Sequence, residues 1–235
     1  MVDRAATVGI VGVLMVLLAA CASQVAEAPR ADTQASGSLP EDYYHRLVAK
    51  GVAVFRVDPA GSLLIMEVRR GGSLARLGHD HVVASHDVVG YLAPDAGRAD
   101  LLVPLDALVV DEPALRAAAG FDTQPSAAAI AGTRRNMLEK VLETDRYPVA
   151  TIAVKAGLAA ASPQQLPIAI TLHGTTATVD AFAQVDKAPD EVTVTGTAAI
   201  DQSRFGITPF SVLGGALAVQ DRVAIRFRIR ARRIY

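Results

Sequence analysis

The sequence VAIRFRIR at residues 223–230 decides the class of fold. Apolar residues occupy every second position in it, at Val223, Ile225, Phe227 and Ile229, and arginines occupy most of the positions between them. Successive side chains of a β-strand point to opposite faces, so a period of two gives one apolar face and one charged face. The stretch is therefore predicted to be an antiparallel strand with one face on a core and the other in water.

The same period of two recurs upstream and predicts a mainly β chain. Further strands are predicted at residues 52–57, 62–70, 77–92, 98–110, 149–158, 166–172, 175–185 and 192–200, and helices at 112–119 and 126–143. Turn residues such as Asp58-Pro59-Ala60-Gly61 and His173-Gly174 separate neighbouring strands. About eight strands joined mostly by short turns predict a closed antiparallel barrel, and a barrel of that size can hold one small ligand.

Six residues are expected to point into this barrel and to line an apolar, ligand-binding pocket: Leu64, Met66, Phe182, Val194, Ile225 and Phe227. The alternation of side chains along a strand supports the two clearest pairs, because Leu64 shares a strand face with Met66, and Ile225 shares one with Phe227. The residues that share a face with Phe182 are Asp180 and Gln184, so its inward orientation does not rest on parity.

The stretch LGHDHVVASHDVVGYL at residues 77–92 holds three of the five histidines. His79 and His81 are two residues apart, so on a strand they leave the same face and could act together as metal ligands. His86 has the opposite parity and joins them only through a bulge or a turn. Two interpretations stay open: a metal site built from His79, His81 and His86, or histidines that bond to the backbone or to Asp87 and orient a loop.

The N-terminus is predicted to be a lipoprotein leader. A positive start at Arg4 and the apolar run 8–18 are typical of a signal peptide, and the run is too short to span a bilayer. Leu18-Ala19-Ala20-Cys21 looks like a bacterial lipobox, which predicts lipidation at Cys21. We therefore expect a signal peptide at 1–20, a lipidated N-terminus and disordered tether at 21–50, and the barrel domain at 51–235.

Composition excludes several classes of function. The net charge of −1 gives no global field that would attract nucleic acid. Cys21 is the only cysteine, so no disulfide can form within the chain. No nucleophile elbow, phosphate loop, catalytic cysteine or zinc-protease motif occurs, and we do not expect an enzyme.

Four short segments resemble, in their order, the YceI-like domain family. They are Phe55-Arg56-Val57-Asp58-Pro59-Ala60-Gly61-Ser62, the helical segment 134–148 ending in Tyr147-Pro148, Ile170-Thr171-Leu172-His173-Gly174-Thr175-Thr176, and Ala199-Ile200-Asp201-Gln202-Ser203-Arg204-Phe205-Gly206-Ile207. The resemblance spans roughly residues 52–232. It implies a lipocalin-like antiparallel barrel of eight strands with a packed helix, a long apolar pocket for a polyisoprenoid or related chain, and a periplasmic setting.

Two functions are therefore expected as alternatives. The first is a lipid-binding protein of the bacterial cell envelope that faces the periplasm. It would be anchored, most simply in the outer membrane, through the lipidated Cys21, and would hold an isoprenoid or similar apolar chain. The second is a metal- or cofactor-binding protein that uses the His79, His81 and His86 stretch. The oligomeric state and the identity of the lipid do not follow from the sequence.

Overall fold

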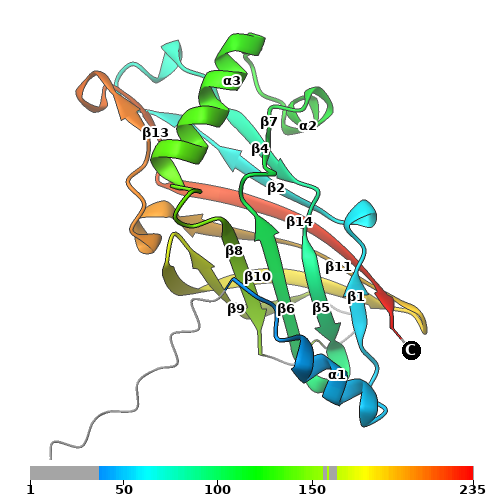
Figure 1. Ribbon diagram of the computed structural model, residues 1–235. Coiled ribbons are helices and arrows are strands. Elements are labelled where there is room, and N and C mark those ends of the chain that lie inside the picture. The colour runs from blue at the N-terminus through cyan, green and yellow to red at the C-terminus, as the bar shows by residue number, and fades with distance from the viewer. Residues whose placement is uncertain (1–36, 156–157, 159–162, 235) are drawn as a thin grey trace, which may run out of the picture. The chain divides into compact units, whose positions relative to one another are not determined.

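A computed structural model of the protein describes residues 37–155, 158 and 163–234. The predicted signal peptide 1–20 and the predicted lipidation site Cys21 lie outside the described residues. The described chain is mainly β, with a few helices placed at the two ends of a curved sheet (Figure 1). Within the described residues, no helix is long and apolar enough to cross a membrane.

Eight antiparallel strands form a closed ring, which confirms the predicted eight-stranded barrel. In spatial order they are β1 (Phe55–Val57), β5 (Val89–Ala93), β6 (Arg98–Pro104), β8 (Val149–Val154), β9 (Gln164–Leu172), β10 (Thr175–Lys187), β11 (Glu191–Asp201) and β14 (Arg222–Arg233). The last strand, β14, returns to the first, with Arg233 opposite Phe55. Burial alternates along β10 and along most of β14, as the period of two requires.

At three positions around the barrel, two shorter strands lie end to end and together form one wall. Strand β2 (Leu63–Val68) continues β1 along β14, β4 (His81–Ser85) precedes β5, and β7 (Val109–Val110) follows β6. The predicted strand 77–92 is therefore wrong as one element, because residues 86–88 leave the sheet. They do so where the partner wall is itself interrupted by the turn Pro59–Gly61.

Two helices follow β7 in the chain and lie at the end of the barrel that is formed by β2, β4 and β7. They are α2 (Pro113–Ala119) and α3 (Ala127–Asn136), and α3 begins where the Ser126 side chain accepts a hydrogen bond from the Ala129 N–H. The helix predicted through residue 143 changes at Met137–Val141 into a wider π-helical turn. Helix α3 contacts β7, and no strand of the described chain pairs with β7 on that side, so α3 and its π turn cover the break between β7 and β8.

Residues 202–221 were not assigned from the sequence and form the rim of this same end. Strand β13 (Leu217–Val219) pairs with both β12 (Ser211–Val212) and β3 (Arg70–Gly71) and forms the middle of a small second sheet. Short 3-10 turns lie at Ala75–Leu77, Pro94–Ala96, Gln202–Phe205 and Leu213–Gly215.

The predicted tether 21–50 extends too far, because helix α1 (Glu41–Ala49) belongs to the folded domain. Tyr44 of α1 is 1% exposed, stacks on Tyr91 and donates a hydrogen bond of 2.7 Å from its hydroxyl to Asp100 Oδ2. Burial, followed by the hydrogen bond to Asp100, raises the pKa of Tyr44 well above its usual value. These partners lie on β5 and β6, so α1 packs on the outside of the wall, at the opposite end from α3 (Figure 1).

Candidate functional site

The barrel encloses a cavity of about 450 Å³, which lies in the range of small-molecule pockets. Its walls are mostly aliphatic side chains from the inner faces of the strands, including Val83, Leu92, Leu101, Val103, Ile152, Val154, Leu166, Ile168, Ile170, Val223 and Ile229. Met137, Val141 and Leu142, from the π turn and the residue after it, complete the lining.

The cavity exists because several interior positions carry small side chains. Ala181 and Ala183 face inward from β10, and Ala198 faces inward from β11. Gly196 also points inward, and a Cβ atom there would lie 2.6 Å from Phe227 Cζ and 2.2 Å from the backbone oxygen of Phe182. The Phe227 ring therefore occupies the space above a glycine, while the alanines leave the middle of the barrel unfilled.

The end of the barrel near β1 is closed by tight packing. Phe55, Val185, Val192 and Ala231 are each no more than 1% exposed and lie beyond Leu92 and Ile229, the last residues of β5 and β14 that line the cavity there. An apolar chain that enters the cavity therefore meets an apolar floor.

Five of the six predicted pocket residues line the cavity: Leu64, Met66, Val194, Ile225 and Phe227. Cross-strand pairing brings them together, with Leu64 opposite Phe227 and Met66 opposite Ile225. The inward orientation predicted for Phe182 is wrong. Its side chain is 60% exposed on the outer face, which it shares with Asp180 and Gln184. Ligand binding by the other five residues stays a prediction.

Polar lining residues gather at the opposite end of the cavity: Arg70, His79, His81, Thr133, Asn136 and Gln202. The register explains this, because Val68 near the end of β2 pairs with His81 at the start of β4, and Asp201 at the end of β11 pairs with Arg222 at the start of β14. Leu77 and Val212 also line the cavity at this end while being 65% and 40% exposed. The polar end is therefore also the end at which the cavity reaches the surface.

His81 is held at this end by Asp111, the residue after β7. The Asp111 side chain is fully buried and lies 2.6 Å from His81 Nδ1, 2.6 Å from Arg116 Nη1 and 3.0 Å from the Val82 N–H. Burial alone would raise the pKa of Asp111, but these hydrogen bonds outweigh it and lower the pKa below its usual range. Asp111 adopts φ of 58°, a left-handed conformation that is uncommon outside glycine, and such outliers gather at functional sites.

The three histidines do not converge. His79 lies beside His81, with ring centroids 6.3 Å apart, and its buried Nδ1 has no hydrogen-bond partner among the described residues. His86 Nε2 instead lies 2.7 Å from Glu112 Oε1, with its side chain about half exposed. Across the described residues, no group of three or more histidine, cysteine or acidic side chains is placed to hold a metal ion. The structure therefore does not assemble the predicted His79, His81 and His86 site.

Sequence reasoning missed Asp111, Thr133 and Gln202 at the polar end. Asp111 is 30 residues from His81 along the chain, and only the pairing of β4 with β7 makes them neighbours. Thr133 comes from α3, which was predicted only as a helix, with no site residue assigned to it. For Gln202 a signal did exist, since it lies within one of the four segments that carry the family resemblance.

Comparison with known proteins agrees with this architecture. Residues 77–231 match the family model described as the YceI-like domain. A polyisoprenoid binding domain from Saccharophagus degradans, implicated in plant cell wall breakdown, superposes with a TM-score of 0.55 at 16% identity, over 77% of this chain and 98% of that one. BcnA from Burkholderia cenocepacia gives a TM-score of 0.53 at 16% identity, over 74% and 98%. No curated protein gives a significant match.

Proposed function

This chain belongs to the YceI-like domain family, and we propose that it holds an isoprenoid or similar apolar chain in its barrel cavity. The proposal rests on how polar and apolar residues are distributed in the cavity. The lining is aliphatic along the length of the cavity, which is closed at the β1 end, and is polar only where the cavity reaches the surface. An amphiphile fits this arrangement when its tail enters first and its polar terminus stays at His79 and His81. Burial of apolar surface at about 25 cal/mol per Å² supplies the affinity.

Native mass spectrometry of the purified barrel tests this proposal. We expect a copurifying apolar compound of several hundred daltons, released by organic extraction, because the cavity would be filled in the cell. Extraction should lower the melting temperature, since a ligand that binds only the folded state stabilises it. A stoichiometric metal that is lost on substituting His79 and His81, without any bound lipid, would instead favour the metal- or cofactor-binding alternative.

We further propose that the protein is a lipoprotein of the bacterial envelope whose barrel faces the periplasm. The apolar run that ends at Cys21 supports this, because lipid chains at that thiol would bind the membrane at about 0.8 kcal/mol per buried methylene. Helix α1 starts at Glu41, which leaves the segment between it and Cys21 as the link.

Cys21→Ser is expected to leave the precursor unprocessed or the barrel unanchored, because serine offers no thiol for lipidation. Membrane and soluble fractions, separated by ultracentrifugation and probed for the protein, measure the effect. A matched serine substitution at Ala22 should leave the partition unchanged. Equal membrane partitioning of Cys21→Ser and the unmodified protein would contradict the lipobox interpretation.

A further inference from the structure

The polar end of the cavity presents one imidazole nitrogen whose role is fixed by the other. His81 Nδ1 lies 2.6 Å from Asp111 Oδ2, and a carboxylate accepts hydrogen bonds, so Nδ1 carries the proton and donates. A neutral imidazole that donates from Nδ1 has its lone pair on Nε2. On a neutral ring, the Asp111 contact therefore makes His81 Nε2 a hydrogen-bond acceptor, and this ring lines the cavity.

This acceptor is only weakly used within the chain. The one described partner of His81 Nε2 is Thr133 Oγ1, at 3.4 Å, near the limit for a hydrogen bond. Beside it, the buried Nδ1 of His79 has no partner among the described residues. Buried polar atoms are normally paired, so two under-used nitrogens on residues that line one end of an apolar cavity point to a polar partner from outside the chain.

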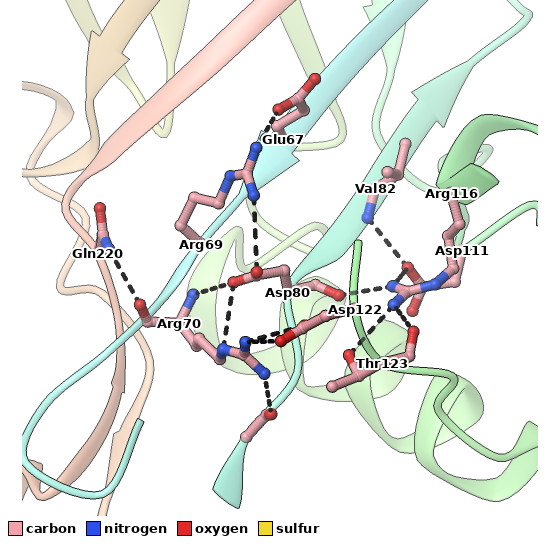
Figure 2. A network of polar contacts seen from close by, with 11 residues as sticks. Glu67, Arg69, Arg70, Asp80, Val82, Asp111, Arg116, Asp122, Thr123 and Gln220 are labelled. Carbon is pink, nitrogen blue, oxygen red and sulfur yellow. Dashed lines mark hydrogen bonds and ion pairs between the residues drawn. The ribbon is translucent and has the colours of Figure 1, made fainter. Parts of the chain in front are cut away.

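Several charged side chains around this end form a network of ion pairs, most of which Figure 2 shows. Four arginines meet four carboxylates there: Arg69, Arg70, Arg116 and Arg226 contact Glu67, Asp80, Asp111 and Asp122. Arg70 is the only lysine or arginine among the described residues that lines the cavity. Its guanidinium donates to both Asp122 oxygens and to the backbone oxygen of Gly78.

Recognition of a phosphate or diphosphate requires cationic donors that are free to face it. Among the described residues that line the cavity, Arg70 is the only such donor and it is already paired with Asp122, and an unpaired anion in an apolar cavity is costly. A hydroxyl group, in contrast, donates one hydrogen bond and carries no charge, which matches an imidazole acceptor.

We propose that His81 Nε2 accepts a hydrogen bond from the hydroxyl head of the bound chain, and that the ligand is a long-chain isoprenoid alcohol rather than its phosphate. This inference rests on the proposed function, because it specifies the head group of the chain that the cavity holds. Asp111 acts as a positioning residue that fixes the tautomer of His81.

Binding of three probes to the delipidated protein tests the head-group assignment: geranylgeraniol, its methyl ether and its diphosphate. The ether keeps the chain and the oxygen but lacks the donated proton. We expect the alcohol to bind about tenfold more tightly than the ether, the equivalent of one hydrogen bond, and more tightly than the diphosphate. Equal binding of alcohol and ether, or tightest binding of the diphosphate, would overturn the head-group assignment and leave the proposed function intact. Failure of all three probes to bind would overturn the proposed function itself.

His81→Phe should abolish the preference for the alcohol over the ether, because phenylalanine keeps a ring of similar size without the acceptor. His86→Phe is the matched control, since His86 lies in the same stretch but contacts Glu112 outside the cavity, and it should keep the preference. A His81→Phe protein that still prefers the alcohol refutes the assignment.

A measurement on the unaltered protein removes any dependence on how that variant folds. In nitrogen-15 NMR spectra, His81 Nε2 should give the signal of an unprotonated nitrogen, which moves when geranylgeraniol is added and stays unchanged with the ether. A protonated Nε2 in the free protein, or identical responses to alcohol and ether, would overturn the inference.

Discussion

Replacement of Asp111 by alanine is expected to destabilise the barrel by about 3–5 kcal/mol, because it leaves the buried Arg116 guanidinium without its carboxylate. The His81 Nδ1–H and the Val82 N–H lose the same acceptor. Urea unfolding followed by circular dichroism measures the free energy of unfolding. Asp122→Ala is the control, since Asp122 pairs with Arg70 at the surface with its side chain 67% exposed, and its loss should be much smaller. Equal effects of the two substitutions would contradict the account of Asp111.

The contribution of Asp111 should also depend on pH. Its pKa is lowered in the folded protein, so its stabilising effect is complete above the unfolded-state pKa of about 3.9 and is lost as the pH falls through the folded-state value. The difference in stability between the unmodified protein and Asp111→Asn should therefore be constant near neutral pH and shrink in acid. A difference that stays the same from pH 7 to pH 3 would contradict the ionised, hydrogen-bonded carboxylate.

Ala183→Phe is expected to weaken isoprenoid binding by at least about 50-fold, because the new ring fills space that several methylenes of the ligand would occupy, each contributing about 0.8 kcal/mol. Ala183 lines the cavity and is 3% exposed. Since the ring enters a void, the free energy of unfolding without ligand should change little, whereas the same change in a filled core would cost about 1–3 kcal/mol.

Gln184, the residue after Ala183 in β10, supplies a matched control for the Ala183→Phe variant. Gln184 lies on the outer face of β10, so Gln184→Phe adds the same ring outside the barrel and should leave affinity unchanged. Isothermal titration of both variants with geranylgeraniol measures the difference. Unaltered affinity of Ala183→Phe, with the variant correctly folded, would place the ligand elsewhere.

The fold could be predicted because its determinants are local. The alternation on β14 and the turns between β9, β10 and β11 specify strands and their connections without reference to distant residues. The barrel's hollow was also visible in the sequence, as the small residues Ala181 and Ala183, but the large apolar Phe182 between them drew the assignment to the wrong face. Parity was the better guide there, since a one-residue shift reverses the face of a strand.

The contacts at the polar end of the cavity could not be predicted, because they form only when strands that are distant in the sequence pair with one another. Asp111 meets His81 only after β4 pairs with β7, and Tyr44 of α1 meets Tyr91 and Asp100, which lies 56 residues away, only in the folded barrel. Spacing along the chain suggested instead that His86 could join His79 and His81, but residues 86–88 leave the sheet and His86 meets Glu112.

One series of melting temperatures shows whether the barrel holds an apolar chain end-on in its cavity. The delipidated protein would be heated with isoprenoid alcohols of increasing chain length at equal concentration. We expect the melting temperature to rise with each added isoprene unit, because each unit buries more apolar surface, and then to level off once the cavity is filled. Ala183→Phe should level off at a shorter chain. A melting temperature that no chain length raises would contradict the claim.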